Sequence, residues 1–246
     1  MSILKGSKRC ILELISSRNF TTEINMLLNP TGAVINPSDV WMPKGIHNDI
    51  EAELKDFLSD NFSNQLGSDI FHWWLAFPSQ ETKTPNWDFV STCTINNQKG
   101  IILVEGKAHL DELQNESKGK ILRSDASENS IANHYKIGKA IEEAKREISV
   151  SFADVAISRD RCYQLSNRVA HAWWLAHNGI PVVLMYLGFI EAEDMKYGKN
   201  RIFETPQDWE MCFLDHVKQV GVDTIMDNWV NCGKGSFNTI CRNKQS

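Results

Sequence analysis

Several patterns that would assign a function class directly are missing from this 246-residue chain. It has no glycine-rich phosphate loop, no HExxH zinc motif and no motif for a serine or cysteine nucleophile. Its longest apolar run, residues 179–190, is shorter than the roughly 20 residues of a membrane span and contains Pro181. We therefore expect a protein that does not cross a membrane.

Metal-binding cysteine patterns and excess positive charge are also missing. The six cysteines include no CxxC pair and no zinc-type spacing, which favours reduced thiols in a cytoplasmic protein. Glu13 interrupts the apolar stretch behind the basic N-terminus, so we expect no signal peptide. The net charge of −5 argues against a protein that coats nucleic acid non-specifically, although a local basic patch would still permit binding.

What the chain does contain is enough apolar material for a large core, with 42% hydrophobic and 9% aromatic residues. We find no internal repeat and no low-complexity linker. We therefore expect one domain over residues 1–246, with an N-terminal extension (1–45), a core (46–190) and a C-terminal extension (191–246).

A strand, a turn and a second strand are predicted within residues 85–107. Residues 89–95 are rich in β-branched and aromatic side chains, residues 96–100 have turn chemistry, and residues 101–104 form a continuous apolar run. A four-residue loop at 96–99 would pair residues whose numbers sum to 195.

In that register Asp88 faces Lys107 and Val90 faces Glu105, so Asp88, Glu105 and Lys107 share one face of the hairpin. An odd-numbered loop would turn Asp88 to the other face unless a bulge restored it. Two adjacent carboxylates favour a shared proton or a divalent cation, and oxygen ligands point to Mg²⁺ or Mn²⁺. A neighbouring lysine suits activation of water for phosphodiester hydrolysis. The alternative is a salt bridge at a strand end.

Asp88 followed by Glu105-Gly106-Lys107 after a strand, turn and strand resembles the PD-(D/E)XK nuclease superfamily, although Pro85 stands three residues before Asp88. The resemblance implies a restriction-endonuclease-like α/β fold with an α-β-β-β-α-β core, its mixed sheet flanked by helices. It also implies that Asp88, Glu105 and the Gly106 carbonyl hold Mg²⁺ (or Mn²⁺) while Lys107 positions water. The stretches TPNWD, VEGKAH and YQLSNR are similar to those of a group of uncharacterised bacterial proteins.

A second informative stretch is the helix predicted over residues 158–177, with Ser158 as its N-cap. Gln164, Asn167, Arg168 and His171 form a polar stripe at helical spacing. Gln164 and Arg168 resemble the QxxxR helix of some superfamily branches, where Gln164 would orient a carboxylate or water and Arg168 would hold a phosphate. The alternative is a set of structural hydrogen bonds at the sheet edge.

The remaining elements are predicted from periodicity and turn residues. A helix over residues 46–62 would carry Glu53, or failing that Asp49, toward the site, and a strand over residues 69–77 would place Trp73 and Trp74 on opposite faces. We also expect a loop at 111–130, helices at 131–148 and 205–220, a strand at 181–190 and a hairpin turn at 233–235.

Together these features predict a Mg²⁺-dependent nuclease with DNA favoured over RNA as its substrate. The alternative function is a non-catalytic module on the same fold that binds nucleic acid or regulates another protein. The sequence leaves open whether cleavage is endo- or exonucleolytic and which oligomeric state forms, a homodimer included.

Overall fold

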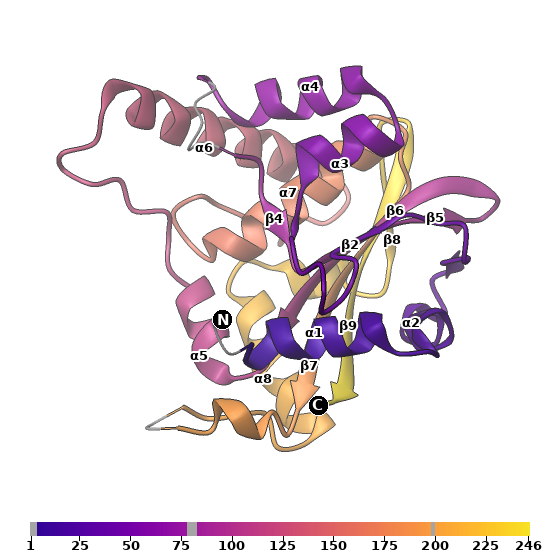
Figure 1. Ribbon diagram of the computed structural model, residues 1–246. Coiled ribbons are helices and arrows are strands. Elements are labelled where there is room, and N and C mark those ends of the chain that lie inside the picture. The colour runs from indigo at the N-terminus through magenta and orange to yellow at the C-terminus, as the bar shows by residue number, and fades with distance from the viewer. Residues whose placement is uncertain (1–3, 78–82, 198–199) are drawn as a thin grey trace.

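The computed structural model describes residues 4–77, 83–197 and 200–246, and a mixed seven-stranded sheet lies at its centre (Figure 1). Its spatial order is β1-β5-β6-β7-β9-β8, with β2 also paired to β5. These strands are β1 (Ala33–Val34), β2 (Trp41–Met42), β5 (Phe89–Ile95), β6 (Gln98–Lys107), β7 (Val182–Ile190), β8 (Trp229–Cys232) and β9 (Gly235–Gln245). A separate two-stranded ladder joins β3 (Ala52–Glu53) to β4 (Asn86–Trp87).

Strand direction changes across the sheet. β5 runs antiparallel to β1, β2 and β6, whereas β6, β7 and β9 run parallel to one another and β8 returns antiparallel to β9. The central strands β6 and β7 have almost continuous buried residues, as expected where helices cover both faces. The mixed α/β class predicted from the sequence is therefore correct.

Alternate residues of β6 point into two apolar layers. Ile101 and Leu103 join the layer that contains residues of α3 (Leu54–Asn61), α4 (Asn64–Trp74), α6 (Glu128–Ile148), α7 (Tyr163–His177) and α8 (Pro206–Lys218). Ile102 and Val104 join the layer under α1 (Gly6–Ser16) and α2 (Phe20–Leu28). The strand period of two thus divides the core between the two faces.

The turn between β5 and β6 is tighter than predicted. Ile95 pairs with Gln98, so the loop has two residues and paired numbers sum to 193 instead of 195. Asn96 and Asn97 adopt left-handed φ values of 49° and 66°, which asparagine tolerates and which two-residue hairpin turns require. Because both loops have even lengths, continuing the register one residue beyond the Phe89–Val104 pair keeps Asp88 on the predicted face but opposite Glu105 in place of Lys107.

Two predicted elements are wrong. Residues 69–77 do not form a strand, because α4 includes residues 69–74. The N-cap of this helix is Ser63, whose hydroxyl accepts a hydrogen bond from the Leu66 N–H. The buried positions Ile70, Phe71 and Trp74 have helical spacing, which the dense aromatic content obscured. The helix predicted at 46–62 begins only at Leu54, since Ala52 and Glu53 pair with β4.

The regions predicted as extensions supply part of the sheet. β1 and β2 pair with the outer side of β5, and α1 packs against β6. β9 pairs with β7 from Val182 to Ile190 and therefore lies inside the sheet. The described residues of the segments 1–45 and 191–246 are thus structural parts of the fold.

Other predicted elements are confirmed: α6, β7, α8 and the β8–β9 hairpin lie where expected. The helix α7 is also confirmed, but its N-cap is Cys162 in place of Ser158. The loop expected at 111–130 contains most of a short helix, α5 (Leu110–Glu116).

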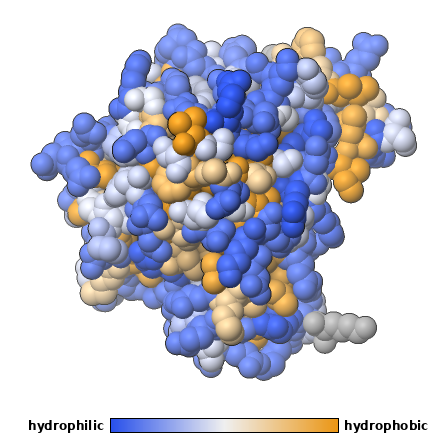
Figure 2. All heavy atoms as spheres, turned by 180° about the vertical axis from the view of Figure 1, so that it is seen from behind, coloured by the Kyte–Doolittle hydropathy of each residue, from blue (hydrophilic) through white to orange (hydrophobic). Residues whose placement is uncertain are grey.

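No helix among the described residues has the length and apolar character needed to cross a membrane. On the face opposite that of Figure 1, hydrophilic side chains cover most of the surface and apolar side chains lie in patches between them (Figure 2).

Candidate active site

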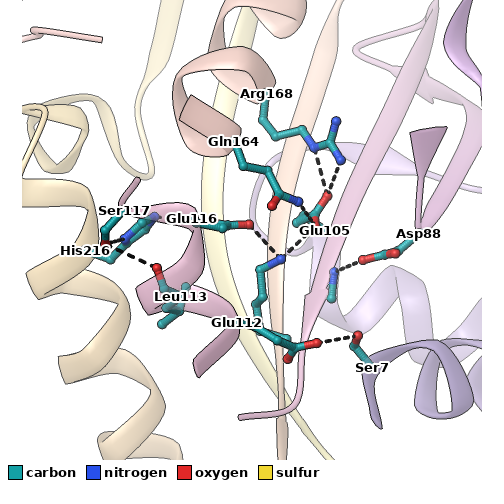
Figure 3. Close-up of polar contacts among 12 residues, drawn as sticks. Ser7, Asp88, Glu105, Glu112, Leu113, Glu116, Ser117, Gln164, Arg168 and His216 are labelled. Atoms are coloured by element: carbon teal, nitrogen blue, oxygen red, sulfur yellow. Dashed lines mark hydrogen bonds and ion pairs between the residues drawn. The ribbon is translucent and has the colours of Figure 1, made fainter. Parts of the chain in front are cut away.

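Five of the sequence-predicted residues meet at the end of β6, beneath α7 (Figure 3). Glu105 is at their centre. Its Oε1 accepts hydrogen bonds from Gln164 Nε2 at 2.5 Å and Lys107 Nζ at 2.7 Å. Its Oε2 lies 2.8 Å from both Nε and Nη2 of Arg168. We call Asp88, Glu105, Lys107, Gln164 and Arg168 the Glu105 cluster.

Local periodicity places these side chains together. Glu105 and Lys107 follow Leu103 at strand spacing, so they point to the face that α7 covers. Gln164 and Arg168 lie one helical turn apart on α7, and both reach Glu105. The polar stripe predicted on α7 therefore meets the strand residues it was expected to meet.

Asp88 joins the cluster from the start of β5. Its Oδ2 accepts a hydrogen bond from the Gly106 N–H at 2.8 Å, which docks the carboxyl beside Glu105. Burial, together with the nearby charge of Glu105, raises the pKa of Asp88 to about 8. Asp88 is therefore protonated at neutral pH unless a cation compensates its charge.

Glu105 and Lys107 respond to burial in the opposite way. Burial opposes ionisation of Glu105, but Arg168 and Lys107 outweigh it and lower the pKa of Glu105. Burial likewise opposes the charge of Lys107, but Glu105 and Glu116 raise its pKa. Both groups are charged although Glu105 is only 3% exposed and Lys107 only 4%.

Arg168 is more constrained than the sequence predicted. Besides Glu105, its Nη2 donates to the Asn86 carbonyl at 2.9 Å. Its guanidinium lies 4.3 Å from the ring centroid of Trp87. Arg168 thus fixes Glu105 against β4, and these contacts occupy the guanidinium that was expected to hold a phosphate.

Sequence reasoning missed two residues that extend the cluster. Glu116 Oε1 lies 2.7 Å from Lys107 Nζ, and Glu116 Oε2 lies 3.2 Å from His216 Nε2. The contact with Lys107 is an ion pair by distance, and neither contact has the angles of a hydrogen bond. Both side chains are at most 2% exposed, so Lys107 is bracketed by Glu105 and Glu116 inside the protein.

A sequence signal for both missed residues was present. Glu116 continues the helical spacing of Leu110 and Leu113, so it falls on the inward face of α5. His216 similarly continues Trp209 and Phe213 on α8. A titratable residue that continues an apolar stripe is a candidate for burial with a partner.

Two predicted carboxylates lie elsewhere. Glu53 Oε1 accepts from the Thr84 N–H at 3.0 Å and from the Thr84 hydroxyl at 3.1 Å, so it braces the segment before β4. Asp49 pairs with Lys8 at 3.0 Å. In the described part of the chain neither contacts Glu105, because the helix that was predicted to present them begins only at Leu54, after both residues.

His171 is a buried core histidine. Its Nδ1 donates to the Asn167 carbonyl at 2.9 Å, and its ring centroid lies 4.3 Å from that of Trp74. Burial lowers the pKa of His171 to about 3, so the imidazole is neutral.

The donor set for a metal consists of oxygens. Within the described ranges no group of three or more His, Cys, Asp or Glu side chains is arranged to hold a metal ion. Asp88 and Glu105 supply two carboxyls, and Asp88 Oδ1 accepts no hydrogen bond from the described residues. In an extended strand the N–H and C=O of one residue point to the same side, so the Gly106 carbonyl also faces Asp88. This chemistry fits Mg²⁺ or Mn²⁺, with two carboxyls and one carbonyl as protein ligands.

Comparisons with known proteins found no matching family model, no matching curated protein and no matching solved structure.

Proposed function

We propose that this protein is a Mg²⁺-dependent nuclease that hydrolyses phosphodiester bonds, with DNA favoured over RNA as substrate. The observation that carries the proposal is the convergence of Asp88, Glu105 and Lys107 on one face at the end of β6. Two carboxyls and a backbone carbonyl can hold a divalent cation, and a lysine beside them can act on its bound water or on the phosphate.

The element order supports this proposal. A helix (α1), short strands (β1 and β2), the β5–β6 hairpin, a helix (α7) and a strand parallel to β6 (β7) follow one another, and α2, β3, α3, α4, β4, α5 and α6 are inserted between them. With these insertions set aside, the order can be aligned with the α-β-β-β-α-β core that the resemblance implies, and this supports the proposal. Its first helix and strand come from residues 6–42, a region that the sequence had placed in an extension.

The residues divide into ligands and supports. Asp88, Glu105 and the Gly106 carbonyl would hold Mg²⁺, which supplies Lewis acidity and a low-pKa water when bound. Lys107 carries a positive charge beside the ligands and would orient the attacking water or neutralise charge on the phosphate. Gln164 and Arg168 hold the two oxygens of Glu105 in place.

The decisive test is cleavage of linear duplex, circular single-stranded and branched DNA with Mg²⁺, Mn²⁺ or EDTA. Asp88→Ala, Glu105→Ala, Lys107→Ala and the milder Lys107→Gln should each reduce cleavage by at least about 100-fold, since each removes a group acting on the transition state. Lys99→Ala is the matched control, because Lys99 lies on the same strand but exposed beside the turn.

Thermal melting verifies that each variant is folded. Cutting of the circular substrate would identify an endonuclease, and RNA would be tested if DNA is not cut. Full activity in all folded variants would refute the proposal.

One observation favours the second candidate, a non-catalytic nucleic-acid-binding or regulatory module. Glu105 and Lys107 are almost completely buried, and three side chains already occupy the oxygens of Glu105. Such a network also serves as a structural ion-pair cluster. A thermal shift on adding Mg²⁺ that disappears in Asp88→Asn favours the nuclease, and no shift with no cutting favours the module.

A further inference from the structure

A cavity of about 520 Å³ lies between α4, the N-terminal part of α6 and the segment that joins α5 to α6. Its volume is in the range of ligand-binding sites. Among the described residues of its lining, the basic side chains are Lys83, Lys120, Arg123 and His134, and the acidic one is Asp125. We call it the basic cavity.

Two of its cations have no anionic partner among the described residues. Arg123 pairs with Asp125 at 3.1 Å, but neither Lys83 nor Lys120 forms an ion pair with any described residue. Lys120 is half-buried, and burial lowers its pKa, which means that its charge is incompletely solvated. In a chain with net charge −5, uncompensated positive charge beside a cavity calls for an anionic ligand.

The backbone around Lys120 is firmly held. The Lys120 N–H donates to the Arg159 carbonyl at 2.8 Å, and the Tyr163 N–H donates to the Lys118 carbonyl at 3.0 Å. His134 Nε2 donates to the Lys120 carbonyl at 2.8 Å. Lys120 is therefore presented by a preorganised segment and not by a free loop.

An aromatic surface lies beside this charge. Lys120 Nζ is 4.8 Å from the ring centroid of Tyr163, which lines the cavity together with Trp74. Proteins that bind single strands combine cations for the phosphates with aromatic rings on which bases stack. The basic cavity therefore offers both groups that recognise a nucleotide.

Its position connects it to the Glu105 cluster. Tyr163 immediately precedes Gln164, which donates to Glu105. Lys83 precedes Thr84 and the short strand β4, whose Asn86 carbonyl accepts from Arg168. Two separate segments of the chain thus connect the cavity lining with residues that contact the cluster.

We propose that the basic cavity binds one nucleotide of a single-stranded nucleic acid, with its phosphate on Lys120 and Lys83 and its base against Tyr163. The choice of a polymer as ligand rests on the proposed function, whereas the nucleotide chemistry rests on the cavity itself. The strand would continue from the cavity toward Asp88 and Glu105.

Fluorescence anisotropy in EDTA tests this site without cleavage. The probe is a labelled single-stranded oligodeoxynucleotide of about 12 nucleotides, a length within the usual site sizes. Lys120→Ala and Tyr163→Leu should each raise Kd at least about fivefold, and Lys120→Ala should reduce the salt slope by about 0.7 because one phosphate contact is lost. Lys120→Arg should restore most of the affinity.

Lys234→Ala is the matched control, because Lys234 is an exposed lysine in the β8–β9 turn, outside the cavity lining. Equal Kd values for wild type and folded Lys120→Ala would overturn the proposal. Binding of a mononucleotide or inorganic phosphate through Lys120, without binding of the oligonucleotide, would overturn the assignment to a strand.

The same experiment separates the two proposals. Oligonucleotide binding in EDTA should depend on Lys120, which lines the cavity, whereas cleavage should depend on Lys107, which does not line it. If the protein binds the oligonucleotide through Lys120 but never cuts, the proposal of a nucleotide site in the basic cavity stands and the proposal of nuclease activity is refuted. If the protein cuts in a metal-dependent way and Lys120→Ala binds as tightly as the wild type, the proposal of nuclease activity stands and the proposal of a nucleotide site in the basic cavity is refuted.

Discussion

At the scale of single residues, Lys107 is held between two carboxylates, one from its own strand and one from α5. The distances from Nζ to Glu105 Oε1 and to Glu116 Oε1 are both 2.7 Å. A buried ammonium needs this compensation, because its desolvation otherwise favours the neutral amine. Glu116 is therefore a positioning residue for Lys107 under the proposed function.

We predict that Glu116→Gln lowers the free energy of unfolding by roughly 1–3 kcal/mol, since the buried lysine loses a charged partner. Cleavage should fall as well, because Lys107 loses one of its two anchors. Urea unfolding and the DNA assay measure the two effects. Asp111→Asn is the control, as it removes an acidic charge from the same helix at a half-buried position. Equal stability of the two variants would contradict this role of Glu116.

At the scale of elements, α7 performs two tasks with one polar stripe. Gln164 and Arg168 reach Glu105, whereas His171 contacts Trp74 of α4. The helix is buried from Leu165 to Ala176, so an ionisable group on it needs a charged partner or must be neutral. His171 satisfies this requirement as a neutral imidazole.

The buried neutral His171 should make folding pH-dependent. Unfolded histidine takes up a proton near pH 6.5, whereas folded His171 does so only near its pKa of about 3. The stabilisation of the folded protein by neutral His171 is therefore complete above pH 6.5. As the pH falls below that value, the free energy of unfolding decreases by about 1.4 kcal/mol per pH unit. Urea unfolding from pH 7 to pH 5 should show a shallower dependence in His171→Gln. Parallel curves for the two proteins would rule out this assignment.

At the scale of the whole molecule, a long C-terminal strand completes the sheet. β9 lies between β7 and β8 and pairs with all nine residues of β7. Without it, the backbone of a central buried strand would lose its partners on one side. The sheet therefore joins the first 45 residues and the last 20 around the same core.

Removal of residues 226–246, which contain β8 and β9, should prevent folding and not merely shorten a tail. The truncated chain should lack a cooperative thermal transition and should be digested rapidly by protease. A control that lacks only Ser246 should melt cooperatively, because the last residue of β9 is Gln245. A cooperative transition in the long truncation would show that the sheet is stable without β9.

The sequence alone determined the parts of this protein that depend on local periodicity. Strand alternation placed Asp88, Glu105 and Lys107 on one face even though the predicted turn was two residues too long, because only the parity of the loop matters. Helical spacing likewise assigned Gln164 and Arg168 to one stripe, and α6 and β7 followed from their apolar patterns.

Tertiary structure decided what depends on partners far apart in the chain. Glu116 and His216 meet across 100 residues, β9 enters the sheet beside β7, and Glu53 turns away from the cluster because Ala52 and Glu53 pair with β4. The aromatic stretch in α4 suits either a buried strand or a buried helix, and packing against α3 and α6 selects the helix. Periodicity records which face of an element is buried, but it does not record which other element covers that face.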